Sequence, residues 1–507
     1  MTAIITDKIK YQLSQTIFDE NQGSTPGDSD NFYYIAVGKS EAYQYLDSAG
    51  GTGNTTDTTV NPVNCDREER LFRYAMQSVK AVAGFSFVVD GSSTKDWTSG
   101  TEYSQFSDAV EGQPASSYYV KTTDNNVYVC IRTGKSSTGT IQPSTVKPEH
   151  TNTGLPIQTD GYIWKFLYTI STADANKFST SNFLPVKFVD SAAPTDPEFS
   201  QLSVQNAAVD GQIVGYRVLN QSSGGIYTVA PRLTIIGDGT HAKARAILDG
   251  SGRVNAVEVM DSNGSGVPTS NGATPDHYNF GANYNYAQVR CEDSSNLSSG
   301  TSAEIVPVFA PNGGLGADPR KDLKSASIMF NIKPSGTEDS DATSQAGSWL
   351  VDNEYRQIAL LKNPTRYDSD GGAGPKYRAT SGRVMNAMKL TSVTGADKNV
   401  STGYAIPFTD DPLIVGADSN ARAYLNYYND DRTLFYHQDE YTGFTPFRNG
   451  ETVTVRTYTG GGTLIIDSAD IEPDVDRFSG DILFLNSKAK VTRDRLQTED
   501  IKLVVRL

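Results

Sequence analysis

Apolar and polar residues alternate over many short stretches of this 507-residue chain, a pattern that predicts β-strands. In the clearest stretch, 162–170, Tyr162, Trp164 and Phe166 share one side and predict a half-buried strand with an aromatic face. Such a face can bind sugars, but large aromatic residues more often belong to a core, and we expect core packing here. Further strands are expected at 33–37, 118–120, 127–131, 355–361, 451–458, 463–466, 482–485 and 501–507, with a hairpin turn at 124–126.

Two stretches have helical spacing instead. Residues 66–82 predict the clearest helix, with Asp66 as its cap, Glu69 completing a capping box and Gly84 ending it. A shorter amphipathic helix is expected near the start of the chain, formed around Ile5, Ile9, Leu13 and Ile17. The 45 glycines and 27 tyrosines favour turns and strands. The predicted fold is therefore mainly β with a few short helices (α+β), arranged as a multi-domain sandwich-like or barrel-like core.

Polar and glycine-rich stretches interrupt these elements and indicate several domains. Loops or joints are expected at 47–64, 312–319, 337–348, 371–374 and 460–462. A weak internal repeat lies between residues 211 and 309, and its two copies predict one small β-domain made of two similar halves. In this repeat Gly211, Ile213, Tyr216 and Val218 match Gly252, Val254, Val257 and Val259, and 239–242 matches 300–303.

Charge and hydropathy argue against nucleic acid and membranes as binding partners. The net charge of −15 without a large basic block argues against nucleic acid and against an anionic membrane surface. No apolar run reaches the length of a membrane-spanning helix, and the first twenty residues lack the apolar core of a signal peptide. We therefore expect a soluble protein that folds in a cytoplasm. Cys65, Cys130 and Cys291 are too far apart to suggest a disulfide framework or a metal site, and are expected to be small buried residues.

The motifs that suggest nucleotide or metal chemistry are incomplete. Gly38-Lys39-Ser40 ends like a phosphate-binding loop, but Tyr33 stands where that loop needs its first glycine. A second copy at 134–136 has Val129 at the same place. The turns 249–252 and 261–264 lack the full ligand series of a calcium loop. None of the four histidines has a His or Cys neighbour at ligand spacing: His150, His241, His277 and His437.

Paired carboxylates are the catalytic arrangement that a sequence is least able to exclude, because two acids need only meet in space. The candidates are Asp439-Glu440 and Asp410-Asp411, and both pairs are expected to be solvated surface residues. No catalytic, cofactor-binding or metal-binding residue is therefore assigned, and the chain is not expected to be an enzyme.

Six short motifs follow one another in an order that resembles a known family. They are Gly38-Lys39-Ser40-Glu41 with Tyr43; Asp96-Trp97 after a helix; Asp160-Gly161-Tyr162 with Trp164; Arg356-Gln357-Ile358 with Asn363-Pro364; Ser479-Gly480-Asp481; and Gln497-Thr498-Glu499 before a final strand. Together they resemble the baseplate wedge subunit of contractile-tailed phages, the gene-product-eight type of T-even-like phages. Long-tailed cyanobacterial phages carry wedge proteins that look similar.

The resemblance covers about 1–200, 312–370 and 476–507, and it implies a discontinuous wedge core with two insertions. Residues 1–200 would form the N-terminal part of this core, 312–375 a return to it, and 476–507 its closing strands. Residues 201–311 would form an inserted β-domain that contains the internal repeat. Residues 376–475 would form a second β-rich insertion.

The resemblance implies a structural protein of the virion, located in the tail baseplate and assembled in the bacterial host cytoplasm. Family members form homodimers within each wedge, contact other baseplate wedge and tail proteins, and help transmit the contraction signal. No cofactor, nucleic acid or membrane insertion is expected. The alternative is a receptor-binding or glycan-binding tail protein, or a depolymerase, in which a tyrosine-rich loop at 424–428 stacks on sugars. A calcium-loaded adhesin is a third reading of the same loops.

Overall fold

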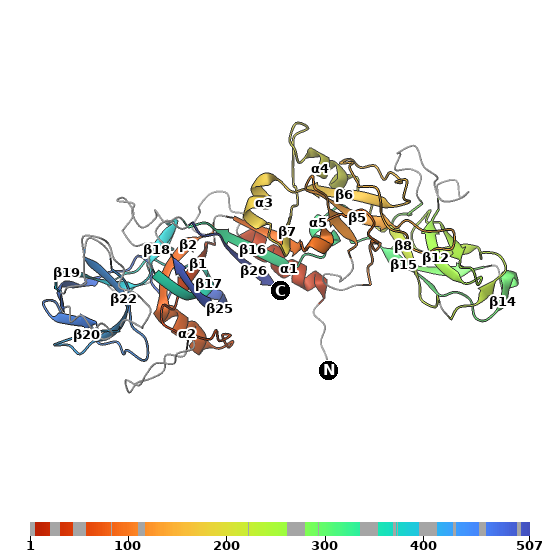
Figure 1. The fold of residues 1–507 in the computed structure, drawn as a ribbon. Coiled ribbons are helices and arrows are strands. Elements are labelled where there is room, and N and C mark those ends of the chain that lie inside the picture. The colour runs from red at the N-terminus through yellow and green to blue at the C-terminus, as the bar shows by residue number, and fades with distance from the viewer. Residues whose placement is uncertain are drawn as a thin grey trace. The chain divides into compact units, whose positions relative to one another are not determined.

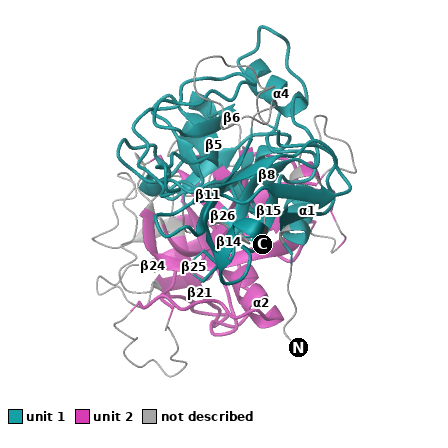
Figure 2. Cartoon of the chain, turned by 90° about the vertical axis from the view of Figure 1, so that its right-hand side faces the viewer, with its two compact units in different colours: residues 1–18, 85–329, 504–507 teal, residues 19–84, 330–503 magenta. Residues whose placement is uncertain are grey.

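The computed structural model confirms a mainly β protein, with 41% strand and 12% helix, several antiparallel sheets and a six-stranded barrel (Figure 1). It describes residues 6–20, 31–43, 57–82, 84–109, 117–221, 223–260, 279–292, 294–334, 353–368, 372, 374–394, 413–428, 432–455, 463–493 and 498–506. The chain divides into two compact units, each discontinuous in sequence (Figure 2). The first unit comprises 1–18, 85–329 and 504–507, and the second comprises 19–84 and 330–503.

The first unit contains an antiparallel sheet of order β4-β5-β6, formed by Tyr119–Lys121, Asn126–Arg132 and Ile163–Thr169. Asn125 takes a left-handed φ of 58° in the turn between β4 and β5, which confirms the predicted hairpin. The aromatic face of β6 is core as expected, because Val204 of helix α4 (Phe199–Asn206) packs onto it. The strand is not half-buried, however, since Ile163 and Leu167 on its other face are buried too.

Other elements of this unit are short. Helix α3 (Thr172–Phe178) begins at Ser171, whose hydroxyl accepts a hydrogen bond from the amide of Asp174. A four-stranded sheet has the order β26-β16-β3-β7, formed by Ile501–Arg506, Ser327–Ile332, Gly84–Asp90 and Phe183–Val186. Further described elements outside the repeat region are helix α1 (Asp7–Glu20, of which residues 7–18 belong to this unit), helix α5 (Pro319–Asp322) and the 3-10 turn η1 (Ser93–Lys95).

The repeat region of the first unit pairs each strand of one half with a strand of the other half. Strand β8 (Ile213–Val218) pairs with β15 (Ile305–Phe309), and the corresponding strands β12 (Val254–Val259) and β11 (Ala244–Leu248) pair with each other. Two further pairs also join one strand from each half. Strand β9 (Ile226–Tyr227) pairs with β14 (Leu297–Ser299), and β10 (Leu233–Gly237) pairs with β13 (Ala287–Cys291). One hydrophobic cluster takes residues from both halves. The pairing therefore has an internal two-fold pattern that follows the repeat in the sequence.

The second unit combines an open sheet with a closed barrel. The sheet has the order β18-β2-β1-β17-β25, formed by Ser381–Arg383, Met76–Ala81, Tyr33–Gly38, Asn353–Lys362 and Asp481–Arg493. Strand β1 is central and all six of its residues are buried, as its continuous apolar sequence predicts. The barrel closes in the order β19-β22-β21-β20-β23-β24, formed by Asn386–Thr394, Thr433–His437, Arg422–Tyr428, Leu413–Gly416, Thr452–Val455 and Thr463–Ile471.

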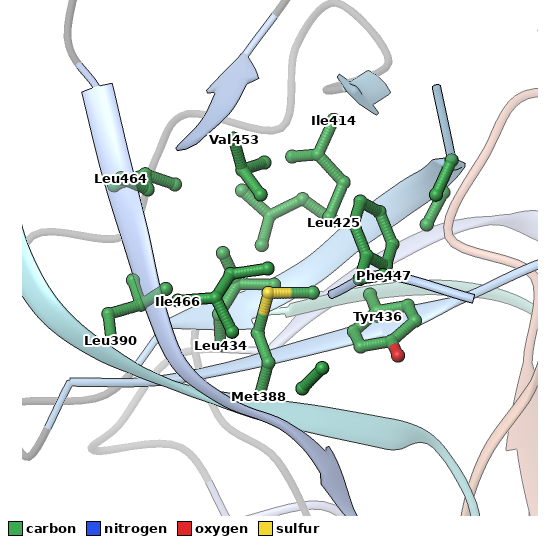
Figure 3. Close-up of a cluster of buried hydrophobic side chains, with 13 residues drawn as sticks. Met388, Leu390, Ile414, Leu425, Leu434, Tyr436, Phe447, Val453, Leu464 and Ile466 are labelled. Carbon is green, nitrogen blue, oxygen red and sulfur yellow. The ribbon is translucent and has the colours of Figure 1, made fainter. Parts of the chain in front are cut away.

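Aliphatic and aromatic side chains from all six strands fill the barrel (Figure 3). Met388 and Leu390 of β19 meet Leu425 of β21 and Val453 of β23 across the interior. Alternate residues point inward, which is the period-two pattern expected of a strand with one core face.

The predicted helix over 66–82 is wrong beyond residue 75. Helix α2 covers Asp66–Ala75, and the chain continues directly as β2. Residues four apart lie on one face of a helix, and they also lie on one face of a strand. Val79 therefore fitted the predicted helix, although it lies in β2 and pairs with Ala36. The N-cap is Cys65, which makes no capping bond, rather than Asp66, and Gly84 begins strand β3.

The cysteine prediction is correct only for Cys130, which is buried; Cys65 is exposed and Cys291 is half-buried. Several predicted features lie outside the described residues: the loop 337–348, the turns 261–264 and 460–462, and Asp410-Asp411. Within the described ranges, no helix is long and apolar enough to cross a membrane.

Candidate functional site

Fifteen residues drawn from the six motifs fall into two groups, one in each unit. The first unit holds Asp96, Trp97, Asp160, Gly161, Tyr162 and Trp164. The second unit holds Gly38, Ser40, Glu41, Arg356, Gln357, Ile358, Asn363, Pro364 and Gly480. Each group is brought together from segments far apart in the sequence.

In the first unit, the Asp160 carboxylate fastens a loop to the start of β6. Its Oδ2 atom accepts hydrogen bonds from the amides of Thr145 (2.8 Å) and Val146 (2.9 Å) and from the Ser144 hydroxyl (3.1 Å). Its Oδ1 atom accepts from the Tyr162 amide at 3.1 Å. Four donors on one carboxylate give it a structural role at this turn, since charge-assisted bonds of this kind are strong.

The other motif residues of this group pack around that turn. The Trp97 indole donates to the Ser144 hydroxyl at 3.2 Å, and its ring lies against the cluster that contains Tyr162 and Trp164, whose rings stack at 5.7 Å. Gly161 has a φ of 85°, and a Cβ there would lie 3.2 Å from the Cα of Gly134, so the turn favours glycine. Asp96 forms an ion pair with Lys121 at 2.9 Å.

In the second unit, Gly38 ends β1 at a point of close approach. It pairs with Met76 on one side and Gln357 on the other, and a Cβ would lie 2.6 Å from the Ala75 carbonyl oxygen. Glycine is the residue type best suited to the unusual backbone angle of this turn, but Gly38 does not take that angle. The left-handed residue is Lys39, with a φ of 65°, and Gly38 is needed for space.

The residues after Gly38 enter a buried polar cluster, named here the Glu41 network: Lys39, Ser40, Glu41, Asn426 and His437. Glu41 lies 2.6 Å from the Lys39 ammonium through Oε1 and 3.3 Å from the His437 Nε2 through Oε2. The Asn426 amide joins the other side, with its Oδ1 2.8 Å from His437 Nδ1 and its Nδ2 donating to the Ser40 hydroxyl at 2.8 Å. Consecutive residues of the turn are thereby tied to barrel strands β21 and β22.

Electrostatics keep Glu41 and Lys39 charged despite their burial. His437 is fully buried and Glu41 is 7% exposed. Burial alone would raise the pKa of Glu41, but the nearby Lys39 and His437 outweigh it and hold that pKa well below its usual range. Burial works against the Lys39 charge as well, yet Glu41 raises the pKa of the lysine.

Arg356 fastens the same turn from β17. Its guanidinium donates to the carbonyl of Ser40, to Asp57 at 2.7 Å and to Glu354 at 3.3 Å. Tyr43 donates its hydroxyl to the Arg356 carbonyl and accepts from the Lys488 amide at 2.8 Å. The turn after β1 is therefore bonded to two strands of the sheet in addition to the barrel.

Asn363 and Gly480 shape the opposite end of the same strands. Asn363 takes a left-handed φ of 53° and its side chain accepts from the Phe32 amide at 2.8 Å. Gly480 has a φ of 68°, and a Cβ there would lie 2.6 Å from the Lys362 carbonyl oxygen and 2.9 Å from the nitrogen of Pro364. Gln357 donates to the Ser487 hydroxyl at 3.3 Å, and Ile358 is a buried residue of the strand.

The chemistry available to the Glu41 network is charge pairing. Its acid and its imidazole face each other within the protein, and the Ser40 hydroxyl bonds to Asn426. Across the described part of the chain, no group of three or more His, Cys, Asp or Glu side chains could hold a metal ion. The arrangement is suited to holding the strands, the turn and the barrel in one geometry.

Of the acid pair Asp439-Glu440, which was predicted to be solvated, only Glu440 is exposed to solvent. Glu440 is a partly exposed partner of Arg67 at 3.4 Å. Asp439 is buried, in contrast to the predicted solvated residue, because its carboxylate accepts from the amides of Tyr441 and Thr442 in a tight turn. The turn 249–252 is an ordinary one, as predicted, with Asp249 accepting from the amides of Ser251 and Arg253.

Sequence reasoning did not find Asn426 and His437, although they complete the Glu41 network. They lie nearly four hundred residues from Glu41. The only local signal is that Asn426 interrupts the apolar residues of β21 and that His437 ends the apolar run of β22. Tyr424, placed by the glycan hypothesis on a loop, lies in β21, is buried and packs against the His437 ring at 5.1 Å between ring centres. No protein-family model matches this chain, and no curated protein matches its sequence.

Proposed function

We propose that this chain is a structural subunit of a phage tail baseplate wedge, which assembles as a homodimer with other wedge proteins and helps transmit the contraction signal. The observation that carries the proposal is the convergence of the motif residues. Glu41, Arg356 and Gly480 are hundreds of residues apart, yet they secure neighbouring strands of one sheet. Residues that carry the resemblance thus stabilise the fold.

The type of bonding also supports a scaffold. A subunit that passes on a mechanical signal has to keep its strands in register under load. In the second unit, strand hydrogen bonds are supplemented by side-chain links from the turn after β1 to β17, β21 and β22. Buried charged links of this kind fix one geometry, because any other arrangement leaves a charge unpaired away from water.

The glycan-binding alternative draws less support from the same residues. Its aromatic candidates at 424–428 belong to a barrel strand, and Tyr424 is buried. The aromatic face of β6 is likewise core packing. Aromatic rings that stack on sugars need a face open to solvent, which Tyr424 and the buried rings of β6 do not offer.

Two measurements on the natural assembly test the proposal. Light scattering on the purified chain should give the mass of a dimer, and mass spectrometry of purified virions should find the chain among the tail proteins. A stable monomer that is absent from purified virions would contradict the proposal.

A further inference from the structure

The first unit has a second feature that the wedge role does not explain. A pocket of about 540 Å³ lies between helix α1 and the segment that follows helix α5. Its volume is in the range of pockets that enclose a small ligand or several peptide side chains. It is lined by Lys8, Tyr11, Gln12, Asn312, Arg320, Lys321, Lys324, Ser325 and Ala326.

Among the described residues that line this pocket, four are cationic and none carries a carboxylate, in a chain with 59 acidic and 44 basic residues. The adjacent acid Asp318 is buried and is contacted by Arg320 at 2.9 Å, by the Tyr11 hydroxyl at 2.8 Å and by the Lys321 ammonium at 3.8 Å. It cancels one of the four charges. The second acid of α5, Asp322, is fully buried, and its burial raises its pKa well above the usual range, which favours the neutral form. The described cations at the pocket therefore outnumber the ionised acids that the structure describes there.

Two of the cations are held in place by the fold. The Arg320 guanidinium is fixed by Asp318 and lies 4.3 Å from the centre of the Phe188 ring. Lys324 has a left-handed φ of 53°, a conformation that glycine adopts more readily, and its ammonium donates to the Ser107 carbonyl at 3.2 Å. A lysine kept in a strained backbone at the rim of a pocket points to a use for its side chain.

We propose that this pocket binds an acidic peptide segment of another protein. Carboxylates of the segment pair with Lys8, Lys321 and Lys324, and an apolar side chain packs on the Tyr11 ring and Ala326. A nucleic acid would need a track of cations along its backbone, whereas here they surround one pocket of a strongly acidic chain. The proposal rests on this pocket alone and does not depend on the wedge role.

The test uses the full-length protein and a fluorescein-labelled peptide that alternates glutamate with leucine. Fluorescence anisotropy should show binding that weakens as salt is raised from about 50 to about 200 mM. The double variant K8Q/K321Q should weaken binding about fivefold to tenfold, since two partly exposed ion pairs are lost. The matched control is K243Q, an exposed lysine that does not line the pocket, and it should bind as the parent does.

A second variant separates binding from folding. K324G removes the ammonium and supplies the residue best suited to the backbone, so thermal stability should be unchanged or higher while peptide binding weakens severalfold. The proposal is overturned if both lysine variants bind the peptide as tightly as the parent. It is also overturned if a glutamine–leucine peptide binds equally well, or if single-stranded DNA of equal charge binds more tightly.

Discussion

Replacing Glu41 with glutamine should destabilise the second unit far more than a surface substitution of the same kind. The carboxylate lies 2.6 Å from the Lys39 ammonium and 3.3 Å from the His437 imidazole. With an effective dielectric constant of about 20, the separation from Lys39 corresponds to an attraction of about 6 kcal/mol before desolvation is subtracted. The side chain of Lys39 is 19% exposed and can regain some water, whereas His437 cannot.

Removing one partner of a buried ion pair costs about 3–5 kcal/mol, because the charge left behind remains away from water. The partial exposure of Lys39 places E41Q near the lower end, at about 3 kcal/mol. The control is E440Q, because Glu440 is also paired with a cation, at 3.4 Å, but at the surface. That variant should change the free energy of unfolding by less than about 1 kcal/mol.

Urea denaturation followed by circular dichroism, together with scanning calorimetry, measures both variants. Calorimetry is needed because two units can unfold in separate transitions, in which case a single midpoint is not well defined. The transition of the second unit should shift in E41Q and keep its position in E440Q. If the two variants differ by less than about 0.5 kcal/mol, the Glu41 network does not stabilise the unit and the reasoning is refuted.

Three further predictions follow from particular contacts. The pKa of Glu41 is lower in the folded than in the unfolded chain, so its contribution to stability is present above about pH 4.3 and is lost as pH falls toward the folded pKa. In an acid titration followed by circular dichroism, E41Q should therefore lose less stability than the parent. G38A should destabilise the second unit by about 1–3 kcal/mol in urea denaturation, since its Cβ would meet a carbonyl oxygen at 2.6 Å, whereas G250A, which meets nothing within 4 Å, should change little. D160A should lower the first unit's unfolding free energy by about 1.5–3 kcal/mol and expose the segment at 144–146 to limited proteolysis, because four hydrogen-bond donors lose a charged acceptor; an unchanged digestion pattern would count against this role.

The sequence predicted local elements well where a single pattern applied. The strand at 33–37, the hairpin around Asn125 and the core position of Trp164 all follow from residue type and alternation. The helix over 66–82 failed where the pattern was ambiguous, because Val79 fits both a helical step and a strand step. Tertiary pairing with Ala36 decided between them.

The Glu41 network was beyond sequence reasoning for a different reason. Glu41 was singled out by its motif, but its meaning depends on His437 and Asn426, which the barrel brings to it from the other end of the chain. No periodicity connects residues across such a distance. The role of Gly38 was also missed, because a close approach to the Ala75 carbonyl leaves no trace in the sequence around either residue.

The central claim, that this chain is a dimeric wedge subunit, is tested most directly by a cryo-EM map of the baseplate from the phage that encodes it. The account predicts two copies of the chain in each wedge, with the sheet of β1, β17 and β25 intact in both and in contact with other wedge proteins. A map that places the chain in distal fibres as a receptor-binding tip, or that contains no copy of it, would contradict the account.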